Sequence, residues 1–277
     1  MKNLLSVFGV RTERAEVTRE TGLRLRDKVA IVTGGDTGIG RAICLAMARE
    51  GAKIVIDYHG DRGPALALAL EIGGFGGSAC DVGADVSKPQ EMQQLIEAAV
   101  QRYGKVDVMV NNAGIEQQHP FIEMPLEIYE KIVAVNLTGT WLGCQLAAKQ
   151  MAQQGRGGRI INISSVHEDV TMPTNAAYCA TKGAIRMLTR TIAVELAPYG
   201  ITVNDVCPGA VDTPIDTSVK RDPEKMDALL REIPMRRMGR PEEVAQLCVY
   251  LASEDAAYVT GASLFIDGGM SKQSGSL

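Results

Sequence analysis

The chain of 277 residues is poor in aromatic side chains, at 4%, and carries no excess of positive charge, since its net charge is −4. Nucleic-acid binding requires a clustered basic surface, so we expect no nucleic-acid partner. No apolar run approaches the length of a membrane-spanning helix. The short apolar patch at residues 4–10 has no cleavage site of small residues and runs into charged residues, which argues against a signal peptide. We expect no membrane association.

The sequence also lacks any pair of cysteines with the spacing of a metal site or a redox motif. A C-x-x-C pair would indicate zinc or a thiol–disulfide exchange centre. The cysteines here stand singly, so we predict reduced thiols, no metal ion and a reducing, cytoplasmic compartment. They are Cys44, Cys80, Cys144, Cys179, Cys207 and Cys248.

Short apolar runs alternate with helical patterns along most of the chain. Alternation of this kind, with continuously apolar strands, predicts a doubly wound parallel sheet covered by helices on both faces. We therefore expect a single-domain, Rossmann-type α/β fold of about seven strands. The strands are predicted at 29–32, 53–56, 78–84, 106–110, 159–163, 201–206 and 263–266, and the helices at 39–49, 63–72, 89–102, 126–153, 176–196 and 241–251.

Two segments depart from this alternation. Residues 1–26 precede the first strand, and we interpret them as an N-terminal extension outside a single catalytic domain at 27–277. Residues 212–234 are polar and charged and follow the sixth strand. In this architecture ligands bind beyond the carboxyl ends of the strands. A long insertion there predicts a mobile lid over the substrate.

A glycine-rich turn follows the first strand, in the order Thr-Gly-Gly-Asp-Thr-Gly-Ile-Gly at residues 33–40. Glycines allow a sharp turn and a close backbone approach, and the following helix directs its N–H groups and positive dipole end at the same point. The turn predicts a pyrophosphate site in a dinucleotide-binding unit. The candidate cofactor-binding residues here are Gly34, Asp36, Thr37, Gly38, Ile39 and Gly40.

The spacing Thr-Gly-x-x-x-Gly-x-Gly resembles that of the classical short-chain dehydrogenase/reductases, and the resemblance covers about residues 27–270. It implies NAD or NADP as cofactor and an enzyme that moves a hydride between the nicotinamide ring and an alcohol or carbonyl carbon. It also implies further cofactor contacts. These are Asp85 and Val86 after the third strand, Asn112, Ala113 and Gly114 after the fourth, and Pro208, Gly209, Val211 and Thr213 after the sixth. Within this set, Val211 and Thr213 would contact the nicotinamide carboxamide.

The end of the second strand bears on the choice between NAD and NADP. An acid there binds the ribose 2′-OH of NAD, whereas a basic residue accommodates the 2′-phosphate of NADP. The residues are Asp57 and Tyr58, and the family's discriminating acid usually falls at the position of Tyr58. Asp36 adds negative charge and His59 offsets it slightly. The pattern favours NAD and leaves dual use open.

Tyr178 and Lys182 lie four residues apart in a predicted helix and therefore share a face. A cation beside a phenol favours the phenolate, which makes the tyrosine a general acid and base near neutral pH. The family resemblance adds two catalytic residues in the same order along the chain. Ser165 would hold the substrate oxygen, and Asn136 would hold a water that links Lys182 to solvent. The lysine and tyrosine would also contact the nicotinamide ribose.

Several stretches are similar to the bacterial glucose 1-dehydrogenases, among them Ser-Ser-Val-His-Glu at 164–168 and Asn-Asn-Ala-Gly-Ile-Glu at 111–116. That resemblance implies a small-molecule substrate, a sugar, with Glu116 and His167 near it. Reduction of a 3-oxoacyl thioester, oxidation of a hydroxysteroid or another alcohol, and a non-catalytic nucleotide sensor of the same fold stay open as alternatives. Relatives imply a homotetramer built on the helices at 126–153 and 176–196 and on the last strand.

Overall fold

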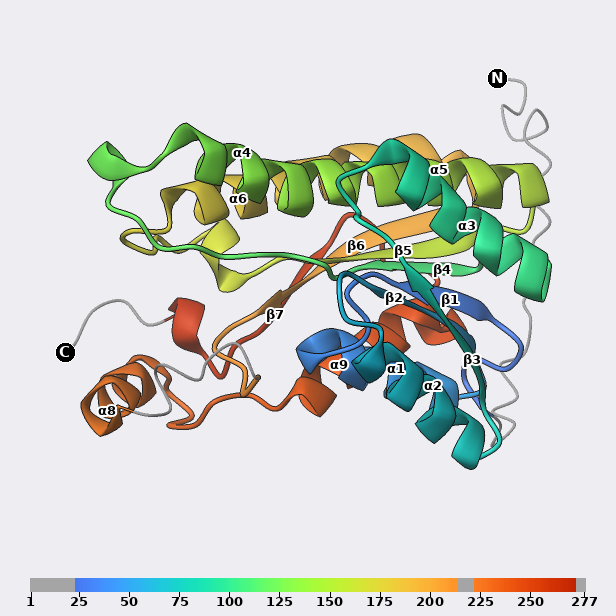
Figure 1. Cartoon of the computed structure of the whole chain (residues 1–277), viewed down its shortest axis with the longest axis horizontal. Helices are drawn as coiled ribbons and strands as arrows, with labels where there is room; N and C mark the ends of the chain where they lie inside the picture. The colour runs from blue at the N-terminus through green and yellow to red at the C-terminus, as the bar shows by residue number, and fades with distance from the viewer. Residues whose placement is uncertain (1–22, 214–221, 273–277) are drawn as a thin grey trace, which may run out of the picture.

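The computed structural model describes residues 23–213 and 222–272, and it contains one sheet of seven parallel strands in the order β3-β2-β1-β4-β5-β6-β7 (Figure 1). This confirms the predicted fold class. The strands are β1 (Val29–Val32), β2 (Lys53–Tyr58), β3 (Ser78–Gly83), β4 (Val108–Asn111), β5 (Gly158–Ile163), β6 (Ile201–Pro208) and β7 (Ser263–Ile266).

Helices cover both faces of the sheet, which is why the central strands are apolar along their whole length. In Figure 1 one layer lies above the sheet and the other below it. The lower layer holds α1 (Gly38–Arg49), α2 (Gly63–Gly74) and α9 (Pro241–Ala252), and the upper layer holds α3 (Pro89–Tyr103), α5 (Gly139–Gln154) and α6 (Ala176–Leu196). Successive residues of β1 point to alternate faces, so Ala30 and Val32 pack in one core and Val29 and Ile31 in the other.

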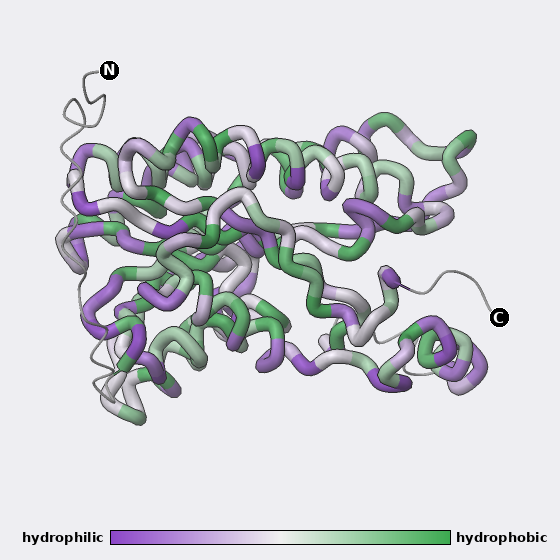
Figure 2. Tube along the Cα trace, turned by 180° about the vertical axis from the view of Figure 1, so that it is seen from behind, coloured by the Kyte–Doolittle hydropathy of each residue, from purple (hydrophilic) through white to green (hydrophobic). Residues whose placement is uncertain are grey.

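The hydropathy of the trace follows this arrangement. Figure 2 shows mostly hydrophobic strands in the middle of the molecule and hydrophilic segments concentrated in the outer turns. Within the described ranges, no helix is both long enough and apolar enough to cross a membrane.

The strand order reverses beside β1. The chain moves outward from β1 to β2 and β3, and then crosses to β4 on the other side of β1. The carboxyl ends of β1 and β4 therefore face a crevice between two loops that leave in opposite directions, which is where ligands bind in sheets of this type. The glycine turn and Asn112–Gly114 stand at this crevice.

The helix predicted over 126–153 is interrupted. It consists of α4 (Leu126–Val133), a π-helical segment at Ala134–Thr138 and α5. The segment lies where the side chain of Asn136 turns inward and bonds the backbone of Ile115 at both its N–H and its C=O. A π segment inserts an extra residue into the turn and is often found at functional sites. Apolar periodicity alone could not reveal it, because the pattern continues across the segment.

Residues at the start of the described chain already pack on the domain. Leu25 is fully buried, and its N–H donates to the carbonyl of Glu50 at 2.9 Å. The Arg24 guanidinium pairs with the Glu50 carboxylate at 2.6 Å. The packed domain therefore begins before the expected boundary at residue 27. The rest of the expected N-terminal extension, residues 1–22, lies outside the described residues.

The expected lid at 212–234 contains a helix, α8 (Pro223–Glu232), which Figure 1 places apart from both helical layers. Asp222 caps it, since its Oδ1 accepts from the N–H groups of Glu224 and Lys225. Ile233 then returns the chain to the domain and is buried. Residues 214–221 of the expected lid lie outside the described residues, and mobility of the lid stays a prediction.

Candidate active site

The glycine turn is fitted around backbone atoms. A Cβ on Gly40 would lie 2.1 Å from the carbonyl oxygen of Gly34 and 2.6 Å from Nδ2 of Asn112, so only glycine fits there. Gly34 and Gly38 have φ values of +54° and +51°, a region that favours glycine. By helical geometry, the first N–H groups of α1 have no partner within the helix. The turn therefore leaves an open backbone cradle at a positive helix end, which fits a pyrophosphate.

Residues 111–114 support this turn from β4. The Asn112 side chain donates to the carbonyls of Thr33 and Gly34, each at 2.9 Å. The Thr33 hydroxyl accepts from the N–H groups of Asn112 and Ala113 at 2.9 and 3.0 Å. Thr33 was not among the predicted site residues, although its position at the end of β1 could have drawn attention to its hydroxyl. The expected cofactor contacts Asn112 and Ala113 thus lie against the turn, whereas Gly114 lies beside the side chain of Asn136.

Asp57 has a structural role at the same turn. Its side chain is 1% exposed, and Oδ2 accepts from the N–H of Gly34 at 3.1 Å. Burial raises the pKa of Asp57 to about 7, against the lowering effect of that hydrogen bond. Its Oδ1 has no hydrogen-bond partner among the described residues. The carboxyl group holds the turn in place, which explains why an acid stands one position before the usual ribose-binding site.

Tyr58, Asp85 and His59 form the outer end of the crevice. The ring of Tyr58 lies over Gly83, where a Cβ would come within 3.0 Å of it. Asp85 accepts from both the N–H and the hydroxyl of Ser87, and these bonds outweigh burial and lower the pKa of Asp85. Val86 is buried against α5, 2.9 Å from where a Cβ of Gly139 would stand. The nearby cation Arg62 is already paired with Asp81 at 2.5 Å.

Lys182 and Ser165 meet at the carboxyl end of β5. Lys182 is 6% exposed, and its Nζ donates to the carbonyl of Ile163 at 2.8 Å. The same Nζ lies 5.4 Å from the centre of the Tyr178 ring. Ser165 is buried, and its hydroxyl accepts from the N–H of His167 at 3.2 Å. Burial lowers the pKa of Lys182 to about 8. A lysine beside a phenol at the end of a strand is the arrangement that acid–base chemistry requires.

Asn136 approaches Lys182 and Tyr178 through a contact with Thr181. Its side chain is 1% exposed, and Nδ2 lies 3.4 Å from the hydroxyl of Thr181, the residue before Lys182. The Thr181 hydroxyl in turn donates to the carbonyl of Tyr178 at 2.7 Å. The structure therefore brings the four expected catalytic residues to one place, from the π segment, the end of β5 and one face of α6.

His167 and Glu116 lie at the rim of this group. The rings of His167 and Tyr178 meet edge to face with centroids 6.4 Å apart. Nδ1 of His167 lies 3.1 Å from the carbonyl of Val170, and because a carbonyl only accepts, this nitrogen carries the proton. Glu116 is exposed, and its charge adds to burial in raising the pKa of the Cys179 thiol, which places it near the residue after Tyr178.

The segment after β6 is held against the start of α9. The Asp212 N–H donates to the carbonyl of Gly239 at 2.8 Å, and Val211 forms a single β-bridge with Gly239. Val211 and Thr213 are buried. Gly209 cannot carry a side chain, since a Cβ would come within 2.9 Å of Asp267. Pro208–Thr213 is therefore a fixed segment beside the catalytic group, as a nicotinamide contact requires.

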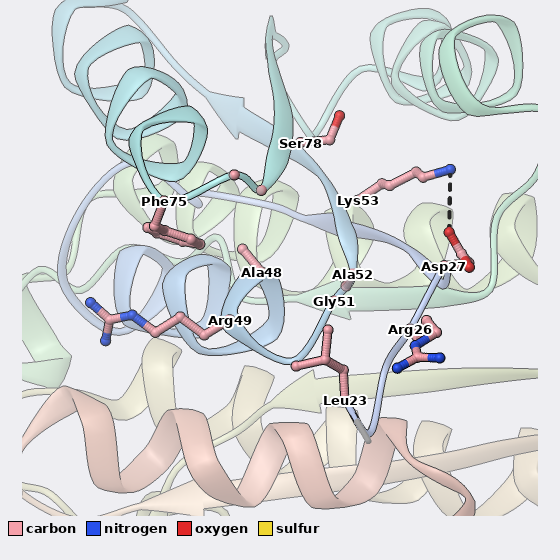
Figure 3. Close-up of a pocket in the computed structure, with 12 residues that line it drawn as sticks. Leu23, Arg26, Asp27, Ala48, Arg49, Gly51, Ala52, Lys53, Phe75 and Ser78 are labelled. Atoms are coloured by element: carbon pink, nitrogen blue, oxygen red, sulfur yellow. Dashed lines mark ion pairs between the residues drawn. The ribbon is translucent and has the colours of Figure 1, made fainter. Parts of the chain in front are cut away.

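A cavity of about 640 Å³ opens elsewhere, at the amino-terminal ends of β2 and β3 (Figure 3). Leu23 and Phe75 line it together with Arg49, and Lys53 Nζ reaches Asp27 Oδ1 at 3.7 Å across one side. Parallel strands all begin at this edge, so the cavity faces away from the predicted catalytic residues. We assign the active site to the opposite edge because the tyrosine, lysine and serine converge there.

The six cysteines are free, as predicted. Among the described residues, one group has the composition of a metal site: Glu168, Asp205 and Cys207, whose side-chain donor atoms lie within 4.8 Å of one another. No motif spacing marks this group, because a turn and a neighbouring strand bring its members together.

Comparison with known proteins agrees with this geometry. The family model described as "Enoyl-(Acyl carrier protein) reductase" matches residues 34–271. The chain is 45% identical over 249 residues to the "L-rhamnose 1-dehydrogenase (NAD(P)(+))" of Azotobacter vinelandii, covering 89% of this chain and 97% of that protein. It is 42% identical to "Glucose 1-dehydrogenase 2" of Bacillus subtilis, covering 89% and 95%.

Two further matches widen the range of substrates. The "3beta-hydroxysteroid dehydrogenase 1" of Eggerthella lenta is 43% identical, covering 89% of this chain and 94% of that protein. The crystal structure of a gluconate 5-dehydrogenase from Burkholderia cenocepacia, in complex with NADP and tartrate, superposes with a TM-score of 0.86 at 34% identity, covering 91% and 98%. The chain therefore belongs to the classical short-chain dehydrogenase/reductase family and is an NAD(P)-dependent oxidoreductase that acts on CH–OH groups.

Proposed function

We propose that this enzyme oxidises an aldose at C1 to the lactone, as the names of its rhamnose and glucose 1-dehydrogenase relatives suggest for those proteins. The observation that carries the proposal is the position of His167 beside the Tyr178 ring. In the tautomer that carries its proton on Nδ1, the imidazole presents Nε2 as an acceptor. Glu116 adds a carboxylate acceptor on the same rim.

Acceptors at this position suit a polyol. A sugar has several hydroxyl donors around its reacting carbon, and a site with matching acceptors discriminates strongly against ligands that lack them. A steroid offers an apolar surface instead and would leave His167 and Glu116 without partners. The exposed position of Glu116 lets it turn toward a bound hydroxyl without the cost of burying a charge.

The catalytic steps assigned to the chain are proton transfers and positioning. Ser165 holds the substrate hydroxyl, and Tyr178 removes its proton as a general base. A nicotinamide cofactor, held by the glycine turn and Lys182, would supply the acceptor for the hydride that leaves the carbon bearing this hydroxyl. Lys182 favours the phenolate through its charge and holds the cofactor ribose. Asn136 holds the water that passes the proton to solvent, and its hydrogen bonds to Ile115 keep it in place.

We infer a preference for NAD over NADP. A 2′-phosphate near the end of β2 would meet negative charge from Asp36 and Asp85. Burial raises the pKa of Asp36, which shows that this part of the crevice disfavours negative charge. Arg62, the nearby arginine, is paired with Asp81. NADP is therefore expected to work more weakly than NAD.

The experiment is a substrate panel with both cofactors, in which formation of reduced nicotinamide is followed by absorbance. We expect turnover with L-rhamnose or D-glucose and a loss of kcat/KM of about 10- to 100-fold in His167→Ala, with partial recovery in His167→Gln, which keeps an acceptor. Turnover of a 3β-hydroxysteroid, with aldoses inert and His167→Ala unaffected, would contradict the sugar site. Turnover of 3-oxoacyl thioesters alone would do the same. Cofactor binding without turnover would favour the nucleotide sensor.

We also propose that the protein is a homotetramer. α5 and α6 expose large apolar side chains, with Trp141 50% and Val194 76% exposed. A hollow of about 310 Å³ lies between these helices, lined by Trp141, Leu188 and Tyr199. A second copy that places the same face here would cover them, and the open edge of β7 offers a second contact.

A further inference from the structure

A pair of carboxyl groups lies buried beneath the catalytic residues. Glu168 follows Ser165 in a short turn, and its N–H donates to the Ser165 carbonyl at 3.1 Å. Asp205 stands on β6, the strand next to β5. The side chain of Glu168 and the whole of Asp205 are 0% exposed. Their oxygen atoms and Sγ of Cys207 lie within 4.8 Å of one another.

The carboxyl oxygens are not satisfied by hydrogen bonds. Neither oxygen of Glu168 has a hydrogen-bond partner among the described residues, and Asp205 Oδ2 has none. Cys207 Sγ donates weakly to Asp205 Oδ1 at 3.6 Å. Two bare carboxylates at this separation repel each other strongly away from water, whereas one shared proton removes the repulsion. The oxygens are buried, lie close together and lack hydrogen-bond partners, which indicates that a proton occupies the site.

The charged groups around the pair come from three elements. α6 contributes Lys182, whose pKa is lowered by burial and raised by the charge of Glu168. It also contributes Arg186, whose Nε lies 3.7 Å from Glu168 Oε1 and whose Nη1 pairs with Asp169. Arg190 of α6 acts on Asp205 from the surface. β6 contributes Cys207, and burial raises the pKa of that thiol far above its usual range, so it stays protonated. His167 and Asp169 flank Glu168 in its own turn.

We propose that Glu168 and Asp205 are positioning residues that share one proton, and that the negative charge left on Glu168 keeps the Lys182 ammonium protonated beneath Tyr178. Lys182 is buried and has only the Ile163 carbonyl as a hydrogen-bond acceptor within the described residues. A buried ammonium loses its proton easily unless a negative charge compensates it. Glu168, whose side chain is fully buried, supplies that charge from the protein interior.

The position of the proton follows from the surroundings. Burial and then the charge of Glu168 raise the pKa of Asp205 to about 7, whereas Glu168 faces Lys182 and Arg186. The proton therefore resides on Asp205 and the charge on Glu168. This inference concerns the catalytic lysine and does not depend on which alcohol is the substrate.

The kinetic test compares three variants across pH with the alcohol that the wild type oxidises. In Glu168→Gln the charge near Lys182 is lost, so less of the phenolate forms, and the acid limb of kcat/KM is expected to move up by about one pH unit. Asp205→Asn leaves the charge on Glu168, so its acid limb is expected to stay in place. The double variant should behave like Glu168→Gln. Equal shifts in both single variants, or no shift in either, would overturn the proposal.

A second measurement needs no substrate. Infrared difference spectra of the apoprotein, wild type minus Asp205→Asn, isolate the carbonyl stretch of a protonated Asp205 from that of Asp57. We expect a protonated-acid band that disappears as pH rises through about 7, and that moves to lower pH in Glu168→Gln because the repulsion is gone. Absence of the band at every pH would overturn the proposal. So would a stoichiometric metal ion that is lost in Cys207→Ala, since a cation would then replace the proton.

Discussion

Lys182 Nζ donates a 2.8 Å hydrogen bond to the carbonyl of Ile163, two residues before Ser165 on β5. This bond joins α6, which carries Tyr178, to the end of β5, which Ser165 follows by two residues. Burial of the ammonium lowers the pKa of Lys182 to about 8. The tyrosine, lysine and serine therefore keep their relative positions before any ligand binds.

Replacing this lysine should remove activity without unfolding the protein. In Lys182→Met the charge that favours the phenolate is absent, and we expect kcat/KM to fall by about 100- to 10,000-fold. Lys131→Met, at an exposed lysine of α4, is the matched control and should retain wild-type rates. Circular dichroism checks that both variants fold. A Lys182→Met protein within about threefold of wild type would show that the lysine charge is not used.

The glycine turn allows a sharp comparison of two alanine substitutions. Gly40→Ala would place a Cβ 2.1 Å from the Gly34 carbonyl, so the turn must open and the cofactor cradle is lost. We expect cofactor affinity, measured by calorimetry, to fall at least tenfold. Gly73→Ala in α2 meets no atom within 4 Å and should leave binding unchanged while stabilising the helix by about 0.5–1 kcal/mol. Tight cofactor binding by Gly40→Ala would contradict the assigned pyrophosphate site.

Much of this architecture could be predicted from the sequence because its signals are local. β1 and β7 were predicted with the observed bounds, and so was α6. Continuous apolar runs bounded by glycine or proline mark doubly covered strands, and the spacing of Tyr178 and Lys182 sets their common face. The proposed roles of Ser165 and Asn136 come from the family resemblance, and the structure brings both residues to the same site.

Other features depend on contacts that no local pattern contains. The π segment around Asn136 exists because the side chain bonds Ile115 across the fold. The sequence predicts Asp57 as a ribose-binding acid, but in the structure its carboxylate accepts a hydrogen bond from the Gly34 N–H. The carboxyl pair joins a turn after β5 to the middle of β6, and only the register of the two strands makes them neighbours.

The buried acids predict how stability depends on pH. Burial raises the pKa of Asp57 from its ordinary value of 3.8 to about 7, so the native state binds the proton more tightly than the unfolded state. Its contribution to stability is therefore full below about pH 4 and is lost as pH rises to about 7, by at most a few kcal/mol. Asp57→Asn can still accept from Gly34 and should reduce this loss. Urea unfolding at about pH 5 and about pH 8 measures it; an unchanged loss would contradict the assignment.

The proposed tetramer interface predicts the effect of one surface charge. Trp141→Glu places a carboxylate in the apolar face of α5 and α6, and burying it against a second copy would be costly. We expect light scattering to show a smaller assembly at the same protein concentration. Leu70→Glu, at an exposed residue of α2 away from that face, is the control and should leave the mass unchanged. A Trp141→Glu protein with the wild-type mass would exclude this face.

The most direct measurement is aldose oxidation by Tyr178→Phe beside Tyr258→Phe, an exposed tyrosine distant in sequence from the catalytic residues. Phenylalanine keeps the ring beside His167 and Lys182 and removes only the hydroxyl to which we assign the proton exchange. The account predicts a fall in kcat/KM of about 100-fold or more for Tyr178→Phe, with cofactor affinity within about threefold of wild type, and no change for Tyr258→Phe. Wild-type turnover by Tyr178→Phe would contradict the assignment of this tyrosine as the general base.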